Sequence, residues 1–192
     1  MDFMKVYENW LNSPALSAEE KAELEAIRND AKEIESRFFD QLSFGTAGMR
    51  GVLGAGMNRM NRYNVRRATK GLAQYLLKTP EQAARGVVIA YDSRRFSAEF
   101  AKDTALVLAQ EGVPAFLFDA LRPVPVLSFA VRHLKAAAGI VITASHNPAI
   151  YNGIKLFTRG GRDATQDITD PVGIAANAVD EKEIISIDFD AA

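Results

Sequence analysis

Apolar residues recur at helical intervals in the first part of the chain. Between residues 16 and 42 they stand three or four positions apart, which places them on one face of a helix. The stripe consists of Leu24, Ile27, Ala31, Ile34 and Phe38. Ser17 and Glu20 have the spacing of a capping box at its start. The pattern predicts one long helix, and packing on its own domain is favoured over a coiled coil because it is the commoner arrangement.

From residue 86 onwards, strand and helix patterns alternate. Short apolar runs predict strands over 86–92, 113–119, 137–145 and 153–158. Helices are predicted over 64–78, from Ser97 to Gly112, and around Pro125. Residues 158–170 have a loop pattern, and a helix is predicted over 172–184. The alternation predicts the α/β class, as a three-layer α/β/α domain over 43–192 that follows a helical extension over 1–42.

Charge and composition exclude several classes of protein. The chain of 192 residues has a formal net charge of −1 and no cysteine. It therefore has no general attraction to nucleic acid or acidic membranes, and it cannot form disulfides or thiolate metal sites. No apolar run approaches the ~20 residues of a membrane span, and the N-terminus lacks the apolar region of a signal peptide. We expect a soluble, cytoplasmic protein that binds neither nucleic acid nor membranes.

Glycine is concentrated between residues 43 and 61, in the stretch "SFGTAGMRGVLGAGMNRMN". This density indicates tight turns or a backbone that approaches another group closely. In the helix predicted next, Val65, Ala68 and Leu72 are expected to face the core. The basic residues Arg66, Arg67 and Lys70 are expected to point mostly outward, and a solvated face explains them at least as well as anion binding does.

The stretch "TASHNP", residues 143–148, places polar side chains directly after a predicted strand. A hydrolase nucleophile is disfavoured, because adjacent Ser145 and His146 rarely reach attack geometry and no G-x-S-x-G elbow is present. A zinc site is disfavoured because only two histidines exist, and His133 lies on a predicted helix. The remaining hypothesis is that Ser145 accepts and returns a phosphoryl group, since Arg50 and Lys155 could supply the positive charge that phosphoryl transfer needs. The tetrapeptide "SHNP" alone is more typical of a simple turn before proline.

Longer motifs decide between these alternatives. "FGTAGMRG", "TASHNP" and "YNGIK" occur in this order, and together they resemble the signatures of the α-D-phosphohexomutases, the phosphoglucomutase/phosphomannomutase superfamily. "AYDSRRFS" and "RPVPVLSFAVRHL" also resemble that family. The "FGTAG" form is similar to its phosphoglucomutase and phosphopentomutase-like branch. The resemblance implies an α/β/α domain with a mixed four-stranded sheet in which one strand is antiparallel.

The resemblance also implies a chemistry and the residues that carry it. Ser145 resembles the phosphoserine, which passes its phosphoryl group to a sugar monophosphate through a bisphosphate intermediate such as glucose 1,6-bisphosphate. Arg50 resembles the arginine near that serine, and His146 the histidine that supports the sugar hydroxyl. Lys155 resembles the lysine that acts as acid/base or holds phosphate. Mg²⁺ is implied as a cofactor, bound partly through the phosphate on Ser145. The net reaction is an intramolecular phosphoryl transfer of the isomerase class.

Other parts of the family pattern are missing. Members of this superfamily have four domains, and the D-G-D-x-D-R metal loop, the sugar-specificity loop and the last phosphate clamp lie beyond the part that matches here. Residues 158–170 also depart from the family pattern. We therefore expect the first domain of a mutase, which needs a phosphosugar substrate and the remaining domains as partners and has no turnover alone. The alternative is a non-catalytic phosphate-binding or interaction module that retains the loop.

Overall fold

A mixed five-stranded sheet forms the centre of the larger lobe of the protein. The computed structural model describes residues 2–45 and 48–179. The strands are β1 (Met49–Val52), β2 (Val87–Tyr91), β3 (Ala115–Leu117), β4 (Ala138–Ile142) and β5 (Tyr151–Thr158), in the spatial order β1-β5-β4-β2-β3. Strands β2, β3 and β4 run parallel, and β5 pairs antiparallel with both β4 and β1. The predicted α/β class and mixed sheet with an antiparallel strand are confirmed.

The predicted count of four strands was wrong because β1 lies inside the glycine-rich segment. It pairs with β5 in the register Met49↔Ile154 and Arg50↔Gly153. Gly51 interrupts the apolar alternation, so the pattern of this short strand is not visible in the sequence. A side chain at Gly51 would also press on Leu42, whose Cδ1 lies 3.1 Å from the position of an added Cβ. The glycines here therefore serve close packing as well as turns.

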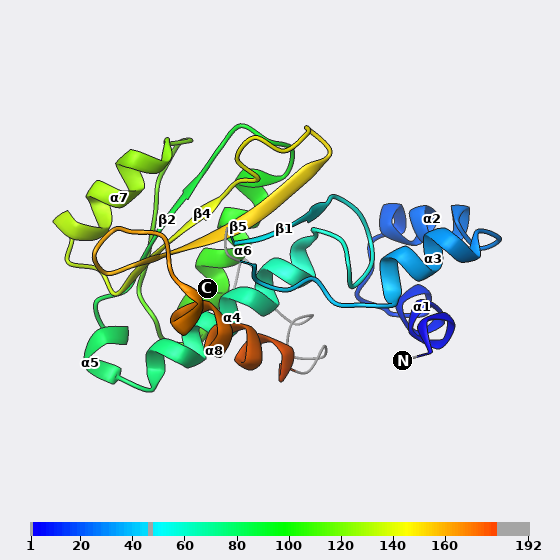
Figure 1. Ribbon diagram of the computed structural model, residues 1–192, viewed down its shortest axis with the longest axis horizontal. Coiled ribbons are helices and arrows are strands. Elements are labelled where there is room, and N and C mark those ends of the chain that lie inside the picture. The colour runs from blue at the N-terminus through cyan, green and yellow to red at the C-terminus, as the bar shows by residue number, and fades with distance from the viewer. Residues whose placement is uncertain (1, 46–47, 180–192) are drawn as a thin grey trace.

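Helices cover both faces of the sheet, which gives the predicted three layers (Figure 1). Helices α4 (Arg62–Leu77), α6 (Ser97–Gln110) and α8 (Gln166–Asn177) lie on one face, and α7 (Val124–His133) lies on the other. The short α5 (Pro80–Ala83) connects α4 to β2. The larger apolar core lies between the sheet and α4, α6 and α8, and a smaller one lies beneath α7. Helix α7 contacts β4, the central strand of the sheet, and β2, which lies between β4 and the edge strand β3.

The predicted helix over 64–78 is present as α4, but its basic residues do not form a solvated face. Asn61 caps α4 by accepting a hydrogen bond from the N–H of Asn64. Arg66 is buried and pairs with Asp103 of α6 at 2.5 Å, and Arg67 is buried and donates to the carbonyl of Leu42. The prediction that these arginines point outward was wrong because α6, α8 and the glycine-rich segment surround α4. Buried guanidinium groups then require partners, which these elements supply.

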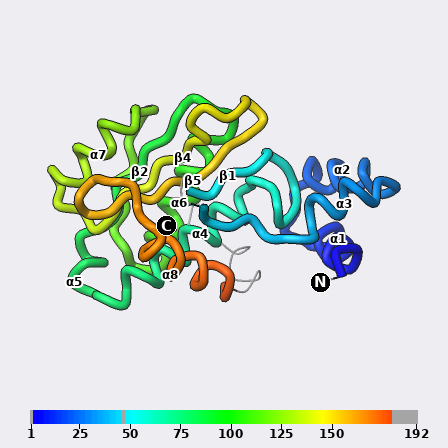
Figure 2. Tube along the Cα trace, in the orientation of Figure 1, coloured from blue at the N-terminus to red at the C-terminus, as the bar shows by residue number. Residues whose placement is uncertain are grey.

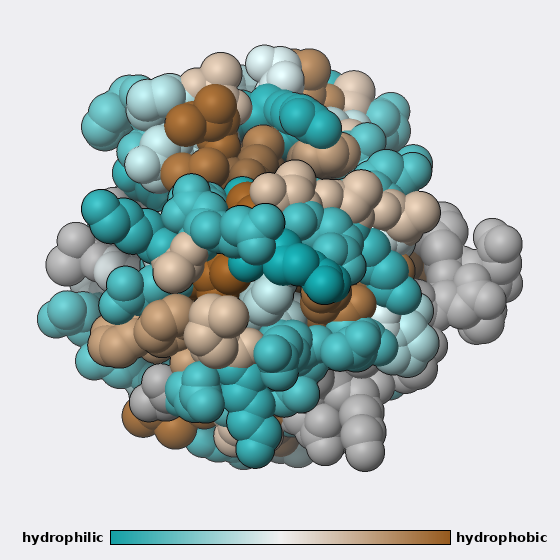
Figure 3. Space-filling model, turned by 90° about the vertical axis from the view of Figure 1, so that its right-hand side faces the viewer, coloured by the Kyte–Doolittle hydropathy of each residue, from teal (hydrophilic) through white to brown (hydrophobic). Residues whose placement is uncertain are grey.

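The N-terminal residues form a second, helical lobe beside the sheet (Figure 2). It contains α1 (Phe3–Leu11), α2 (Ala18–Ala26) and α3 (Ala31–Phe38). Its apolar cluster includes Tyr7, Leu24, Ile34 and Phe38, and the rings of Tyr7 and Phe38 meet edge to face at 5.7 Å. Polar side chains cover most of the face of the molecule on this side, with apolar side chains between them (Figure 3).

The single long helix predicted for this region was wrong. The capping box of Ser17 and Glu20 is present, but α2 ends at Ala26. Asp30 then caps a new helix by accepting from the N–H of Glu33. The break lets the two short helices turn their apolar faces towards α1. The stripe continues in phase across the break, so its period alone does not reveal the turn.

Helix α8 occupies part of the segment predicted to be a loop. It begins at Gln166 and contains Pro171, whereas the prediction placed a helix only over 172–184. Its Val172 and Ala176 are buried against α4. Of the predicted helix, residues 180–184 lie outside the described part of the chain. Within that described part, no helix combines the length and the hydrophobicity needed to cross a bilayer.

Candidate functional site

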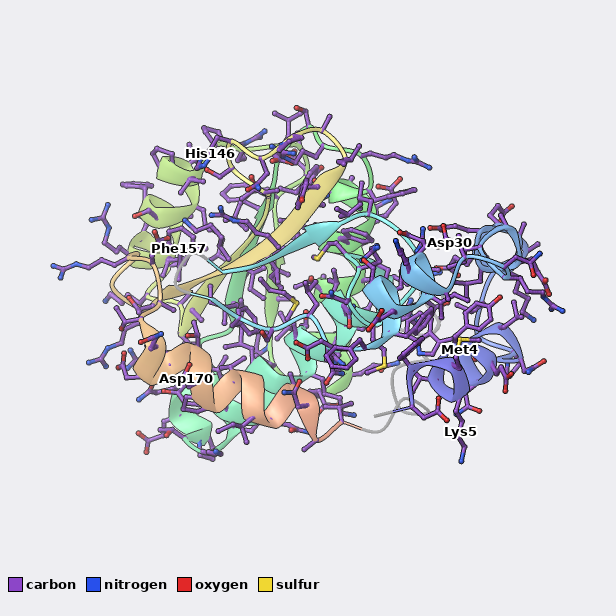
Figure 4. The ribbon with its side chains drawn as sticks, turned by 45° about the vertical axis from the view of Figure 1, so that its right-hand side comes forward. Met4, Lys5, Asp30, His146, Phe157 and Asp170 are labelled. Carbon is purple, nitrogen blue, oxygen red and sulfur yellow. The ribbon has the colours of Figure 1, made fainter. Side chains whose placement is uncertain are left out.

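The loop between β4 and β5 presents Ser145 and His146 to solvent. Both side chains are exposed, and Asn147 is half-buried. The Oγ of Ser145 lies 3.4 Å from Nδ1 of His146, which is long for a hydrogen bond between these groups. Ser145 has a φ of 57°, and its N–H donates to the Oγ1 of Thr143 at 3.0 Å. Figure 4 shows His146 on this loop, on the side of the sheet opposite Asp170 of α8. The side chain of Ser145 is therefore exposed to solvent, and its backbone has a left-handed conformation.

Arg50 reaches this loop from the edge strand β1. Its Nη1 donates to Oδ1 of Asn147 at 3.3 Å, across 97 positions of sequence. Gly153 lies opposite Arg50 in the sheet, and a Cβ there would come within 2.8 Å of Cγ of Arg50 and 2.6 Å of the carbonyl of Met49. The glycine therefore leaves room for the arginine to pass over β5. The Nε of Arg50 is buried without a partner within the described residues, so this guanidinium still has donors for an anion.

Lys155 lies on the same face of the sheet as Arg50, but its ammonium group pairs with a residue outside the loop between β4 and β5. It stands two residues beyond Gly153 on β5, and alternate residues of a strand share a face. Its Nζ lies 3.1 Å from the carboxylate of Asp163 and 5.6 Å from the centre of the Phe157 ring. The structure therefore brings Ser145, His146 and Arg50 to one loop, while it holds the ammonium of Lys155 at Asp163.

Sequence reasoning missed Asp163 because the contact depends on a turn. After β5 the chain folds back, so that Thr158 donates to the carbonyl of Arg162 and Asp163 bridges to Phe157. The pair of glycines at 160 and 161 signals such a turn, but it does not say which carboxylate meets the lysine.

A second group of residues near the loop was also missed. Arg94 follows β2, and its guanidinium donates to main-chain carbonyls of the loop, beginning with Ser145 at 2.8 Å. Ser97, where the predicted helix starts, does not cap α6: Phe96 occupies the cap position with a φ of 65°. The hydroxyl of Ser97 instead donates to Asp92 at 2.7 Å. These residues belong to the stretch "AYDSRRFS", for which the sequence suggested a family motif but no contact.

A cavity of about 1050 Å³ lies away from this loop, between α2 and the helices α4 and α6. Glu20, Arg62, Arg66 and Asp103 are among its lining residues, and Ser145, His146 and Arg50 are not. Among these residues, Asp103 accepts hydrogen bonds from both arginines, and Glu20 accepts one from the neighbouring Tyr63. Burial, followed by the Glu20 carboxylate, raises the pKa of Tyr63. We therefore assign this cavity to the junction of the two lobes.

Side chains of the types that ligate metals do not gather into one cluster within residues 2–45 and 48–179. No group of three or more His, Cys, Asp or Glu side chains in these ranges is arranged to hold a metal ion. His133 is exposed at the end of α7, as expected, and stacks on Phe129 with ring centres 5.4 Å apart.

Comparison with known proteins relates most of the chain to one family. Residues 41–183 match the family described as phosphoglucomutase/phosphomannomutase, alpha/beta/alpha domain I. The chain belongs to this family. It is 41% identical over 155 residues to a phosphoglucomutase of Staphylococcus haemolyticus, covering 81% of this chain and 28% of that protein. It is 45% identical over 150 residues to a phosphoglucomutase of Staphylococcus aureus, covering 77% of this chain and 26% of that protein.

A solved structure supports the same family. The crystal structure of a candidate phosphomannomutase from Thermus thermophilus superposes with a TM-score of 0.64 and 33% sequence identity. The match covers 74% of this chain and 30% of that one. The chain thus spans little more than a quarter of the length of the phosphoglucomutases that it resembles. The predicted superfamily is confirmed.

Proposed function

We propose that this chain is the phosphoserine-bearing first domain of a phosphoglucomutase-like enzyme. In this proposal Ser145 carries a phosphoryl group between the 1- and 6-positions of a hexose phosphate. The observation that supports it is the convergence of three groups: an exposed Ser145, the adjacent His146, and Arg50, which reaches the loop from β1 with donors to spare. Membership of the family supports the isomerase class.

The proposed cycle contains two phosphoryl transfers. In the first, the P–O bond to Oγ of phosphorylated Ser145 breaks, a P–O bond to a sugar hydroxyl forms, and the hydroxyl loses its proton to a base. The product is a bisphosphate, here glucose 1,6-bisphosphate. In the second transfer, the P–O bond between the sugar and its other phosphoryl group breaks and a P–O bond to Oγ of Ser145 forms. The Ser145 hydroxyl gives up its proton, the freed sugar oxygen takes a proton, and a sugar monophosphate leaves. The net change moves one phosphoryl group within the sugar.

The three side chains around the serine have distinct proposed roles. Phosphoryl transfer depends mainly on positioning and on stabilising negative charge. Arg50 would bind the phosphoryl oxygens through Nε and the terminal N–H groups that have no partner among the described residues, since a guanidinium fork matches phosphate. His146 would orient the sugar hydroxyl or take its proton, because its ring is adjacent to Oγ. Lys155 would hold phosphate or act as acid/base once its ammonium leaves Asp163.

The described residues do not by themselves fit a Mg²⁺ site. Mg²⁺ requires about six oxygen ligands in near-octahedral geometry. The carboxylate oxygens of Asp92, which follows β2, are engaged by Arg94 and Ser97. Mg²⁺ bound partly through a phosphate on Ser145 therefore requires further ligands from outside the described residues. Neither transfer of the proposed cycle is routed through the metal.

The proposal separates a single phosphoryl uptake from continuous turnover. The chain should accept one phosphoryl group from glucose 1,6-bisphosphate but should not convert glucose 1-phosphate continuously. Continuous conversion needs both ends of the bisphosphate to be held while it reorients, and the proposed site around Ser145 would hold one end.

A burst assay tests this. The chain is mixed with glucose 1,6-bisphosphate and Mg²⁺, and glucose 6-phosphate is measured with a coupled dehydrogenase. We expect release of glucose 6-phosphate up to one equivalent of protein, its loss in Ser145→Ala, and a normal burst in Ser93→Ala, which removes an exposed serine of the β2–α6 loop. Saturable binding of the bisphosphate without a burst would favour the non-catalytic phosphate-binding module instead.

A further inference from the structure

Arg94 donates hydrogen bonds to the main chain of the Ser145 loop, residues 143–150 between β4 and β5, and of the first residue of β5. Nη2 donates to the carbonyls of Ser145 at 2.8 Å and Asn147 at 2.7 Å. Nη1 donates to the carbonyls of Pro148 at 2.9 Å and Tyr151 at 3.0 Å. Each terminal nitrogen of a guanidinium has two N–H groups, so these four carbonyls use all four. One side chain from the β2–α6 loop thus spans the connection between β4 and β5.

The arginine is itself held in place. Oδ1 of Asp92 accepts from the main-chain N–H of Arg94 at 3.0 Å and from the hydroxyl of Ser97 at 2.7 Å. Oδ2 of Asp92 lies 3.4 Å from Nε of Arg94. Asn152, at the start of β5, donates to Oγ of Ser97 at 3.0 Å and to the carbonyl of Arg95. This network leaves the Arg94 guanidinium little freedom to turn away from the loop.

The backbone at Ser145 needs such support. A residue other than glycine with a φ of 57° is in the left-handed region, which is unfavourable for a side chain with a Cβ. Such conformations persist where the surroundings hold them from several sides. Here the N–H of Ser145 is bound by Thr143 and its carbonyl by Arg94. Both peptide groups that flank the serine are therefore fixed.

Arg94 and Arg50 differ in what their donors can still do. Within the described portion of the chain, the Arg50 guanidinium donates one hydrogen bond, to the Asn147 side chain, and its buried Nε has no partner. Arg94 donates its terminal N–H groups to main-chain carbonyls, and its guanidinium forms an ion pair with Asp92. Arg50 is thus suited to bind an anion, whereas Arg94 is suited to hold the loop.

We propose that Arg94, oriented by Asp92, is a positioning residue that fixes the conformation of the Ser145 loop for phosphoryl transfer without touching the phosphoryl group. The catalytic part of this inference rests on the function proposed above. The contact between Arg94 and the loop does not depend on that function, so the contact and its catalytic effect can be tested separately.

Amide hydrogen exchange tests the contact itself. The N–H of Asn147 donates to Ala144 and that of Tyr151 donates to Pro148, so both amides report on the loop. In Arg94→Met we expect about tenfold faster exchange at these amides, and an intermediate increase in Arg94→Lys, because an ammonium has three donors for four carbonyls. The matched control is Arg95→Met, which removes an exposed neighbour whose guanidinium lies 4.5 Å from the ring centre of Phe96. Exchange at the β4 amides serves as the internal reference, and Arg94→Lys gives the comparison if Arg94→Met does not fold.

The burst assay tests the positioning role. A displacement of about 1 Å in a reacting group can cost about a hundredfold in rate, so we expect the maximal rate of phosphoryl uptake to fall ten- to a hundredfold in both Arg94 variants. The half-saturating concentration of glucose 1,6-bisphosphate should change by less than about threefold, because Arg94 does not touch phosphate. Arg95→Met should match the wild type in both quantities.

The outcomes separate the two proposals. Unchanged exchange in the loop of both Arg94 variants would overturn the inference, and so would faster exchange with an unchanged maximal rate. A wild-type chain that takes up no phosphoryl group would instead contradict the proposed function, and the exchange data would still decide whether Arg94 holds the loop.

Discussion

Replacing Gly71 by alanine should destabilise the protein, although alanine is the better helix former. Gly71 lies in α4, where it packs against α8. A Cβ added there would lie 2.6 Å from the carbonyl oxygen of Val172, 2.7 Å from the N of Ala176 and 2.8 Å from its Cβ. Two of these three atoms belong to the backbone, so α8 would have to move.

The magnitude follows from two opposing terms. Alanine gains about 1 kcal/mol over glycine in a helix interior, and overpacking of a close contact costs about 1–3 kcal/mol. With backbone atoms at less than 3 Å, we take the upper end of that cost, which leaves a net loss of about 2 kcal/mol. For a chain of this size the melting temperature should fall by roughly 4–8 °C.

Gly173 provides a matched control in α8 itself. The nearest atom to a Cβ added there is Cδ2 of Phe44 at 4.0 Å, an ordinary contact. Gly173→Ala should therefore gain about 1 kcal/mol from helix propensity alone, and its melting temperature should rise by roughly 2–4 °C. Urea unfolding followed by circular dichroism measures both variants. A Gly71→Ala variant as stable as the wild type would refute the close packing of α4 on α8.

Three further predictions concern side-chain charge. Arg50→Lys loses the guanidinium fork and should slow phosphoryl uptake by about tenfold or more without faster amide exchange in the Ser145 loop. An unchanged rate of uptake would contradict a role for Arg50 in binding the phosphoryl group. Lys155→Met should slow uptake more than it lowers the melting temperature, and parallel losses of both would indicate a structural role. The hydrogen bond from Arg37 lowers the pKa of Glu33, against the effect of burial. The contribution of the ionised Glu33 to stability is therefore complete above its ordinary pKa of 4.5, and it is lost as the pH falls through the lower pKa of the folded state. The difference in melting temperature between wild type and Glu33→Gln should therefore shrink between about pH 6 and pH 3, and a constant difference would contradict this.

Sequence patterns predicted the elements whose signals are local. The strand that ends before Ser145 and the capping box at Ser17 depend on a few neighbouring residues, and both are present. Short-range periodicity could not show that α4 is covered on its basic side, because this depends on where α6 and α8 pack. Arg66 was therefore expected in solvent, yet it is buried beside Asp103.

The contacts around the loop were beyond local patterns for a related reason. Arg94 meets carbonyls 51 to 57 positions away, and Arg50 meets Asn147 across 97 positions. Such pairs become visible only when the order and direction of the strands are known. The family motifs pointed to Ser145 and Arg50 without that knowledge, but they did not indicate how the loop between β4 and β5 is held.

The most direct test of the central claim is to locate phosphate on the protein. The chain is incubated with glucose 1,6-bisphosphate and Mg²⁺, quenched and digested, and the peptides are sequenced by tandem mass spectrometry. The account predicts one phosphoryl group, on Ser145, absent from Ser145→Ala and retained in Ser93→Ala. Phosphate on another serine or on none, in a chain that is folded by circular dichroism, would contradict the assignment of Ser145 as the phosphoryl carrier.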